Sequence, residues 1–443
     1  MTRVVVLGGG SAGEAFVGAA RRLDAGLEVT LVEKALVGGE CTFWACMPSK
    51  TLLRAPELLA AARQAPGAAE AVTGRLDIDR VFWWRDQVVE GYDDNAHGRW
   101  LADRDTALVR GSAVVKRPGV LDVEGRELEF DKLVVATGSR PALPPIEGIA
   151  DVPHWTTADA TSAKEVPASL VVVGGGASGV ELAQLYHRLG ARVTIVQRSR
   201  LLTKTAEDAA SLLQNRLEEE GVIVRCGAGV ARVDADDGGV TLSLEDGDTV
   251  SAERLLLAVG RTPSIHGLGL ELLGVELSEQ AIVVDEHLAA AEDVWAIGDV
   301  TGVSLFTHVA KYQARVAASN VAGERRAADY RAVPAVVFTD PQVAQVGTVE
   351  GDGLVSSSWE VNRTSRSSTY ERPKRDGFVR LVADPALGVL VGAVAVGPEA
   401  GEWLQQATLA IRAEVPIDVL RDTIQPFPTF SEAISFAARD LPL

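Results

Sequence analysis

The chain begins with a hydrophobic run that leads directly into a glycine-rich turn. Residues 3–7 read RVVVL, and an unbroken apolar run rich in β-branched residues is typical of a strand buried on both faces. Hydrophobic residues then recur at helical spacing up to residue 23, and a second apolar strand ends at Glu33. The turn before the helix holds three glycines at GxGxxG spacing, Gly8, Gly10 and Gly13. This order predicts a dinucleotide-binding fold, with the pyrophosphate at the helix start and the adenosine ribose on Glu33.

The same pattern returns in residues 169–200. Its glycine turn consists of Gly174, Gly176 and Gly179. The second strand of this unit ends in Gln197 instead of an acid, and Arg198 and Arg200 follow. Two arginines near the ribose position favour a 2′-phosphate, so we expect NADPH, with NADH as the second option. Surface arginines in an ordinary turn are the alternative.

Composition and charge exclude several functions. A chain of 443 residues is too long for one core, so we expect two to four domains. Its 47% hydrophobic and 23% charged residues are typical of a globular protein. The net charge of -18 argues against binding to nucleic acid or anionic membranes. Because no apolar run is long enough to span a membrane and residues 2–10 make a poor signal peptide, we expect a cytoplasmic protein.

Two cysteines lie close together in the segment GGECTFWACMPSK, residues 38–50. In a cytoplasmic chain, a close pair such as Cys41 and Cys46 indicates redox chemistry rather than a structural disulfide. No further Cys or His lies near enough in sequence to complete a zinc site, so we predict no metal. A helix start near Pro48 would lower a thiol pKa. Two buried cysteines that never bond are the alternative, and Cys226 is expected to be buried and inert.

Together these segments resemble the class I pyridine nucleotide-disulfide oxidoreductases, the family of glutathione reductase, dihydrolipoamide dehydrogenase and mercuric reductase. GGECTFWACMPSK is similar to the redox-active segment, KLVVATGSRP and VWAIGDV to flavin-binding segments, LLLAVGRTP to the end of the nicotinamide domain, and VVFTDPQVAQVG to the start of the dimerisation domain. The resemblance implies an α/β fold with two Rossmann-like, three-layer ββα domains and a C-terminal α+β dimerisation domain. The implied domains are FAD-binding (1–148 and 264–329), NAD(P)-binding (149–263) and dimerisation (330–443).

The resemblance implies that the first fold binds FAD and the second NADPH. Glu33 would hold the adenosine ribose of FAD, the backbone at 111–113 would approach the adenine, and Asp299 would accept hydrogen bonds from the ribityl chain. Further positions implied to line the cofactors are Lys34, Gly39, Lys50, Ala113, Thr137, Gly138, Gly260, Arg261 and Thr307. Each has an ordinary turn residue as its alternative.

The resemblance also implies a path for the electrons. Cys46 would lie against the flavin and Cys41 would meet the substrate, so that electrons pass from NADPH through FAD to a Cys41–Cys46 disulfide. Lys50 and Glu181 would form an ion pair beside the isoalloxazine, where a positive charge stabilises the anionic reduced flavin. A solvated lysine and an acid on a helix surface are the alternatives.

Several positions depart from the family pattern. Glu40 stands where many relatives have threonine, near the expected pyrophosphate, so its carboxylate must point away or find a cationic partner. Phe43 and Trp44 replace smaller residues between the cysteines. The segment FPTFSE has Phe427 where disulfide reductases carry a proton-shuttling histidine from the partner subunit, and it keeps Glu432. Because a phenyl ring cannot transfer a proton, efficient reduction of glutathione disulfide or lipoamide is not expected.

Three functions fit these residues. The first is a homodimeric NAD(P)H-dependent flavoenzyme whose dithiol reduces a small disulfide, a quinone or a metal ion; mercury is disfavoured because no cysteine pair lies near the C-terminus. The second resembles 2-ketopropyl-coenzyme M oxidoreductase/carboxylase, in which phenylalanine also replaces the histidine. The third is a flavin-binding scaffold without catalysis, which would not need Cys41, Cys46, Lys50 and Glu181.

The implied dimerisation domain would complete the active site across the subunit interface. Phe427 of one subunit, with Phe43 and Trp44 of the other, would form an aromatic wall at Cys41, with ordinary interface core as the alternative. Within this domain we expect an exposed Ser-rich loop at residues 355–368 and a helix near residues 402–414.

Overall fold

The first predicted dinucleotide-binding fold is built on a parallel sheet. The computed structural model describes residues 1–23, 26–236, 238–370 and 376–443, and it divides into two units. The first unit comprises Met1–Ser49, Trp83–Ala142 and Gly260–Asp329. Its six-stranded sheet has the order β17-β18-β7-β1-β2-β3, with all neighbours parallel except β17 and β18. The strands are β1 (Thr2–Leu7), β2 (Leu27–Glu33), β3 (Ala107–Arg110), β7 (Lys132–Val135), β17 (Ala289–Ala291) and β18 (Val294–Ala296).

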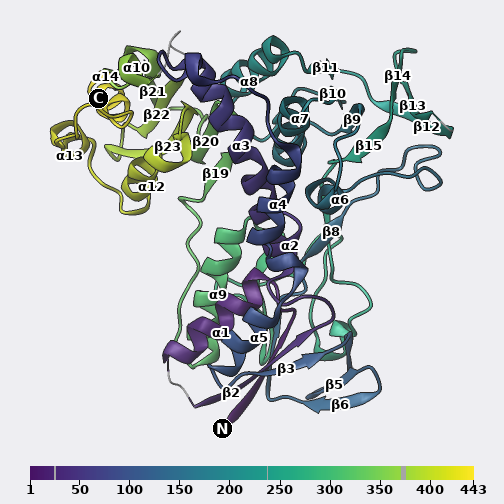
Figure 1. The fold of residues 1–443 in the computed structure, drawn as a ribbon. Helices are drawn as coiled ribbons and strands as arrows, with labels where there is room; N and C mark the ends of the chain where they lie inside the picture. The colour runs from purple at the N-terminus through teal and green to yellow at the C-terminus, as the bar shows by residue number, and fades with distance from the viewer. Residues whose placement is uncertain (24–25, 237, 371–375) are drawn as a thin grey trace. The chain divides into compact units, whose positions relative to one another are not determined.

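One layer covers each face of this sheet. Helices α1 (Ser11–Leu23) and α9 (Thr307–Val321) lie side by side on one face, where Phe16 is fully buried (Figure 1). A three-stranded antiparallel sheet covers the other face, and its Leu121 packs in one cluster with Val5. These strands are β4 (Ala113–Arg117), β5 (Val120–Val123) and β6 (Arg126–Glu129). The predicted strands and helix around the first glycine turn are confirmed.

The second unit repeats the three layers. It comprises Lys50–Phe82, Leu143–Val259 and Tyr330–Leu443. Its four parallel strands have the order β11-β10-β9-β15, with Leu185 and Leu213 of the covering helices buried on one face. An antiparallel sheet, β12-β13-β14, packs on the other. The elements are β9 (Ser169–Val173), α7 (Ala177–Leu189), β10 (Arg192–Gln197), α8 (Glu207–Glu220), β11 (Ile223–Cys226), β12 (Val230–Asp236), β13 (Gly239–Leu244), β14 (Thr249–Ala252) and β15 (Arg254–Leu257).

An antiparallel sheet of order β19-β20-β23-β22-β21 forms the C-terminal part of the second unit. Helices pack against it through a core that includes Leu381, Ala407 and Ala433. The elements are β19 (Pro334–Val337), β20 (Gln342–Gly347), β21 (Val355–Glu360), α10 (Ser367–Tyr370), β22 (Phe378–Asp384), β23 (Val389–Gly397), α11 (Ala400–Trp403), α12 (Gln405–Arg412), α13 (Ile417–Asp422) and α14 (Glu432–Asp440). The predicted fold class, with two three-layer domains and a C-terminal α+β domain, is confirmed.

The prediction of an exposed Ser-rich loop was wrong. Residues 355–360 form strand β21, in which partly buried positions alternate with exposed ones. Its inward side includes Ser357, whose hydroxyl donates to the carbonyl oxygen of Ala437. Strand pairing supplies the backbone partners, so small polar residues are tolerated in this edge strand. The helix expected near residues 402–414 is present as α11 and α12.

Eight further elements include those that carry predicted site residues. They are α2 (Gly39–Phe43), α3 (Cys46–Gln64), α4 (Ile78–Val88), α5 (Asn95–Ala102), β8 (Ser139–Pro141), α6 (Thr157–Ser162), β16 (Arg261–Pro263) and the 3₁₀ turn η4 (Gly298–Thr301). Strands β8 and β16 pair with each other. The predicted domain limits stay a prediction.

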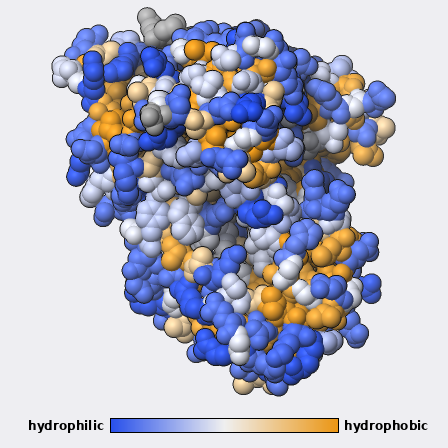
Figure 2. Space-filling view, turned by 90° about the vertical axis from the view of Figure 1, so that its right-hand side faces the viewer, coloured by the Kyte–Doolittle hydropathy of each residue, from blue (hydrophilic) through white to orange (hydrophobic). Residues whose placement is uncertain are grey.

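Hydrophilic and hydrophobic residues are mixed on the surface. The face drawn in Figure 2 is mostly hydrophilic, and hydrophobic residues gather there in several separate areas. Among the described helices, none is both long and apolar enough to cross a membrane.

Candidate active site

The first glycine turn has the shape needed to hold a phosphate group. A Cβ atom on Gly8 would lie 2.3 Å from the Ala136 carbonyl oxygen, and one on Gly13 would lie 2.0 Å from the Gly8 oxygen. Both positions therefore require glycine for packing. A Cβ on Gly10 would meet only the Cα of Gly39, at 4.0 Å. The backbone of Gly10 thus borders open space at the start of α1, where the first N–H groups lack intrahelical acceptors, and this arrangement fits a pyrophosphate.

Glu33, at the end of β2, stabilises this turn through hydrogen bonds. Its carboxylate oxygens accept the backbone N–H groups of Gly9 at 2.6 Å and Ala35 at 2.7 Å. The acid therefore stands at the strand end where dinucleotide folds place the ribose-binding carboxylate, and its role in ribose binding stays a prediction.

The second glycine turn repeats this design. A Cβ on Gly174 or Gly179 would collide with a backbone oxygen at 2.4 or 2.0 Å, whereas one on Gly176 would meet nothing within 4 Å. Gln197 takes the structural place of the acid, because its amide oxygen accepts the N–H of Gly175 at 2.9 Å. A neutral amide at this position leaves no carboxylate to repel a 2′-phosphate.

The two arginines beyond Gln197 have different surroundings. Arg200 turns its guanidinium back onto the chain and donates to four backbone carbonyl oxygens, those of Leu201, Leu202, Thr203 and Thr205. Arg198 is 78% exposed and lies 3.7 Å from a Glu245 carboxylate oxygen. The geometry therefore offers Arg198, but not Arg200, to a 2′-phosphate.

The two cysteines meet at a threonine hydroxyl. Cys41 lies in α2 and Cys46 is the first residue of α3, and neither forms a disulfide. The Thr307 hydroxyl, at the start of α9, donates to the Cys41 sulfur at 3.1 Å and lies 3.4 Å from the Cys46 sulfur. The hydrogen bond from Cys46, followed by those from Thr307 and Ser11, lowers the pKa of Cys41 to about 6 against the opposing effect of burial. Cys41 is therefore largely a thiolate at neutral pH.

A polar network surrounds Asp299. The Ser139 hydroxyl donates to Asp299 Oδ2 at 2.5 Å, and Arg261 Nε donates to the Ser139 hydroxyl at 2.6 Å. Arg261 Nη2 donates to the Ser139 carbonyl oxygen at 2.8 Å and to Glu40 Oε2 at 2.5 Å. The cationic partner that Glu40 requires is therefore Arg261, which sequence reasoning did not identify.

A buried glutamine stabilises the turn that carries Asp299 through two hydrogen bonds. Gln313 is fully buried on α9, and its amide oxygen accepts the Gly298 N–H at 2.7 Å while its amide nitrogen donates to the Thr301 hydroxyl at 3.1 Å. Sequence reasoning missed this residue. It could have been found as an amide residue among the apolar positions of a helix. Burying an amide is costly unless both its oxygen and its nitrogen are hydrogen-bonded.

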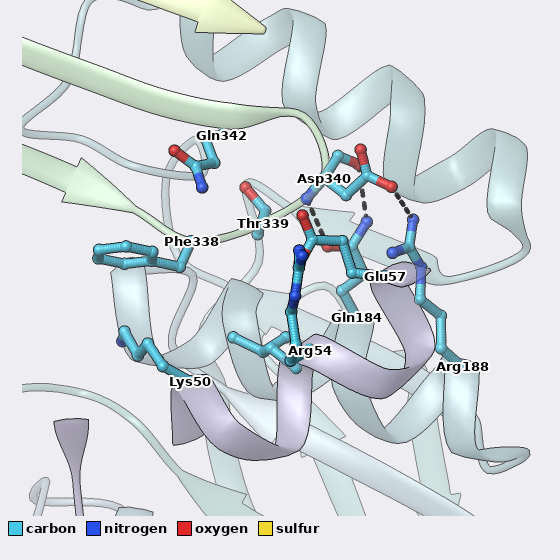
Figure 3. Close-up of a pocket in the computed structure, with 10 residues that line it drawn as sticks. Lys50, Arg54, Glu57, Gln184, Arg188, Phe338, Thr339, Asp340 and Gln342 are labelled. Atoms are coloured by element: carbon cyan, nitrogen blue, oxygen red, sulfur yellow. Dashed lines mark hydrogen bonds and ion pairs between the residues drawn. The ribbon is translucent and has the colours of Figure 1, made fainter. Parts of the chain in front are cut away.

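Lys50 and Glu181 form the predicted ion pair. Lys50 Nζ lies 2.6 Å from Glu181 Oε2, and the Glu181 side chain is only 5% exposed. The other carboxylate oxygen of Glu181 accepts the backbone N–H of Phe338 at 2.9 Å, and Lys50 Nζ lies 4.8 Å from the centre of the Phe338 ring. Lys50 and Phe338 line a cavity of about 200 Å³ (Figure 3). A buried carboxylate with two partners holds the lysine cation in one place.

Side chains of helix α7 form hydrogen bonds with the loop that carries Phe338. The amide oxygen of Gln184 accepts the Asp340 N–H at 2.8 Å, and its amide nitrogen donates to the Asp340 carbonyl oxygen at 2.9 Å (Figure 3). Arg188 Nη2 donates to the Asp340 carboxylate at 2.9 Å. Gln184 and Arg188, which sequence reasoning did not select, thus position the loop against Glu181.

Of the two aromatic residues between the cysteines, Phe43 does not contribute to the expected wall. Phe43 is 1% exposed and packs against His97, with ring centres 5.7 Å apart. Trp44 is partly buried and stacks on Tyr92, with ring centres 6.3 Å apart. The prediction that Phe43 faces an acceptor was wrong, because this ring fills the interior beside Gly38.

Phe427 and Glu432 lie close to each other in sequence but have separate environments. The Phe427 side chain is 74% exposed. Glu432 begins α14, and its carboxylate accepts the Thr429 N–H at 3.2 Å. The Glu432 carboxylate therefore binds the backbone of its own turn. The exposed Phe427 ring could contact another protein surface.

The other predicted cofactor positions are mostly backbone features. Gly138 and Gly260 adopt left-handed backbone conformations with open space beside them, and the Thr137 hydroxyl donates to the Ser264 carbonyl oxygen at 2.7 Å. Lys34 is exposed and Ala113 is buried. Their roles stay predictions.

The expectation that Cys226 is buried was wrong. Its side chain is exposed at the end of β11, although partial burial raises its pKa. No group of three or more potential metal ligands occurs among His, Cys, Asp and Glu in the described part of the chain.

Comparisons with known proteins agree with this geometry. A family model described as pyridine nucleotide-disulphide oxidoreductase matches residues 2–314, and one described as the dimerisation domain of the same family matches residues 333–438. A mercuric reductase from Shigella flexneri is 34% identical over 97% of this chain and 79% of its own length. A dihydrolipoyl dehydrogenase from Thermus scotoductus is 34% identical over 99% of this chain and 97% of its own length.

Two solved structures superpose on nearly the whole chain. LpdA from Mycobacterium tuberculosis superposes with a TM-score of 0.89 at 27% identity, covering 99% of both chains. The HOCl-induced flavoprotein disulfide reductase RclA from Escherichia coli superposes with a TM-score of 0.87 at 27% identity, also over 99% of both chains.

Proposed function

Because the chain belongs to the pyridine nucleotide-disulphide oxidoreductases, we propose that it passes electrons from NADPH through FAD and the Cys41–Cys46 pair to a small acceptor. Members of this family are oxidoreductases that use FAD and NAD(P)H. The match to the dimerisation domain supports a homodimer, and an active site shared between its subunits is part of the proposal.

The observation that carries the proposal is the contact of the Thr307 hydroxyl with both cysteine sulfurs. The hydroxyl lies 3.1 Å from the sulfur of Cys41 and 3.4 Å from that of Cys46. Cys46 also begins a helix, whose N-terminal partial charge favours a thiolate. Two cysteines kept for packing alone would not need a hydroxyl donor and a pKa lowered to about 6 at Cys41.

FAD, when bound, supplies the two-electron transfer between nicotinamide and sulfur. The residues fit this cofactor, since the open backbone of Gly10, the acid at Glu33 and the polar group of Asp299 form a donor and acceptor set suited to a pyrophosphate, a ribose and a ribityl chain. Lys50, fixed by Glu181, would stabilise negative charge on the reduced ring system.

The thiols would then carry the reaction with the acceptor. For a disulfide acceptor, the Cys41 thiolate attacks one sulfur and releases the other as a thiolate, which takes up a proton from water to give the first product thiol. Cys46 then attacks Cys41, releases the second product thiol and closes the Cys41–Cys46 disulfide. NADPH and one proton restore both thiols, so each cycle oxidises one NADPH and reduces one disulfide.

Phe427 restricts the choice of acceptor. A phenyl ring gives no proton to a leaving group, so acceptors that need none at this position are favoured, namely metal ions, quinones and disulfides that carry their own acid. Two relatives point to metal ions: the mercuric reductase, and RclA, which was also solved as a Cu(II) complex. Nothing in the geometry favours reductive thioether cleavage with carboxylation or a purely structural role.

A steady-state screen tests the proposal. Oxidation of NADPH and NADH is followed with small disulfides, quinones and Cu(II), in wild type and in Cys41→Ser. An acceptor reduced through the dithiol loses at least about a hundredfold in rate with Cys41→Ser, because the nucleophile is gone. Equal rates in both proteins for every acceptor would exclude the dithiol route, and bicarbonate-dependent turnover would favour carboxylation.

A further inference from the structure

Glu40 and Arg261 form an ion pair at the edge of the expected flavin site. We infer that Glu40 competes with the diphosphate of FAD for the Arg261 guanidinium and thereby lowers the affinity of the protein for its cofactor. The inference rests on the proposed FAD site and adds a residue that weakens binding there.

The position of the pair follows from its neighbours. Glu40 directly follows Gly39, and a Cβ on Gly39 would lie only 2.8 Å from the Cα of Gly10 in the glycine turn. Arg261 Nε lies 3.9 Å from Asp299 Oδ2, the expected partner of the ribityl chain. In FAD the diphosphate joins the adenosine to the ribityl chain. It must therefore pass from the glycine turn towards Asp299, along the path that the pair borders.

The charges along this path conflict. A diphosphate carries two negative charges, and Arg261 is the cation that the network around Asp299 and Ser139 presents to it. Glu40 already neutralises this guanidinium at 2.5 Å and would repel the phosphates.

Glu40 is the partner that can leave. Its side chain is 41% exposed, so the carboxylate can turn into water, where it is well solvated. Arg261 is 26% exposed and is held by two hydrogen bonds to Ser139, so its guanidinium stays in place. A phosphate that takes the place of Glu40 at Arg261 Nη2 therefore requires the pair to open, and the affinity for FAD is then reduced by the stability of that pair.

The test is the affinity for FAD of purified holoprotein, measured by flavin fluorescence in a dilution series. Glu40→Gln keeps the size and the hydrogen-bond acceptor of the side chain but removes the charge. We expect it to lower the dissociation constant of FAD roughly tenfold, because a competing charge is lost. The matched control is Glu127→Gln on β6, a 43% exposed carboxylate paired with Arg117, which should leave the dissociation constant unchanged.

A double variant separates competition from simple repulsion. Arg261→Gln alone should weaken FAD binding, and adding Glu40→Gln to it should recover little, because the competitor acts through the guanidinium. An unchanged or higher dissociation constant in Glu40→Gln would overturn the inference, and the higher value would make Glu40 a residue that positions Arg261. Failure of both wild type and Glu40→Gln to bind added FAD would instead contradict the proposed function.

Discussion

The Thr307 hydroxyl donates a hydrogen bond to the sulfur of Cys41 over 3.1 Å. These residues are separated by 266 positions, and the contact joins the start of α9 to the short helix α2. Together with the hydrogen bond from Cys46, it favours the thiolate of Cys41. The reactivity of this sulfur is therefore set by residues on three different helices.

Thiol alkylation should distinguish Cys41 from Cys226. The pKa of Cys41 is lowered to about 6, mainly by Cys46, while burial raises that of Cys226. At pH 7, iodoacetamide should label Cys41 at least about tenfold faster than Cys226 in the reduced protein, as mass spectrometry of the peptides would show. Thr307→Val should move the Cys41 profile to higher pH, and Thr307→Ser should not. Equal labelling rates at pH 7 would contradict this account.

The same pKa predicts how stability depends on pH. An ordinary thiol has a pKa of 9.0, and Cys41 in the folded state has one of about 6, so the folded protein loses its proton first. The stabilisation from this group is absent below pH 6, grows between pH 6 and 9, and is complete above pH 9. Urea unfolding of the reduced protein should show this rise, and Cys41→Ser should remove it. A parallel rise in Cys41→Ser would assign it to other groups.

The two arginines after Gln197 should differ in function. Arg198→Ala should raise the dissociation constant of NADPH about tenfold and leave that of NADH unchanged, because one charge-assisted contact to the 2′-phosphate is lost. Arg200→Ala should instead lower the melting temperature, because four carbonyl oxygens lose their donor. Binding is measured by calorimetry. An equal loss for both nucleotides in Arg198→Ala would show that no 2′-phosphate is recognised.

Gln184 should be important for stability. Its buried amide hydrogen-bonds to both backbone groups of Asp340, so Gln184→Leu removes two hydrogen bonds and should lower the free energy of unfolding by about 2 kcal/mol. Asn215→Ala, at an exposed position of α8, should change it by less than about 0.5 kcal/mol. Chemical denaturation measures the free energy of unfolding of both variants. Similar changes in the two would show that Gln184 does not hold the loop.

Phe427→His should raise activity on a small disulfide. The side chain is 74% exposed, so the exchange is tolerated by the fold, and an imidazole can donate the proton that the product thiol needs. We expect kcat/KM to increase by about tenfold or more, whereas Phe427→Leu should give no gain. The measurement requires that size-exclusion chromatography shows the dimer in each variant. No gain with an intact dimer would mean that proton supply does not limit the reaction.

The sequence was most informative where backbone geometry is encoded by residue type. Gly8 and Gly13 are required because any side chain would collide with backbone oxygens, so their spacing predicts the turn and the layers around it. Glu33 stands at the end of a strand whose hydrophobic pattern is clear. For these features, local sequence and tertiary structure obey the same constraint.

Side-chain directions could not be predicted in the same way. Arg200 has the right position for a phosphate, but its guanidinium binds four carbonyl oxygens of its own loop. Glu40 meets Arg261 across 221 positions, and Phe43 turns into the interior. The direction of each of these side chains depends on contacts that form only in the folded protein. Neither the hydrophobic periodicity nor the residue type predicts those contacts.

A thiol count shows whether electrons from NADPH reach the two cysteines. Oxidised holoprotein is treated with NADPH without oxygen, acid-quenched, unfolded and titrated for thiols. We expect a gain of two thiols per chain in wild type and none in Cys41→Ser, with Cys226 contributing equally throughout. Bleaching of the flavin without any gain of thiols in wild type would contradict the account.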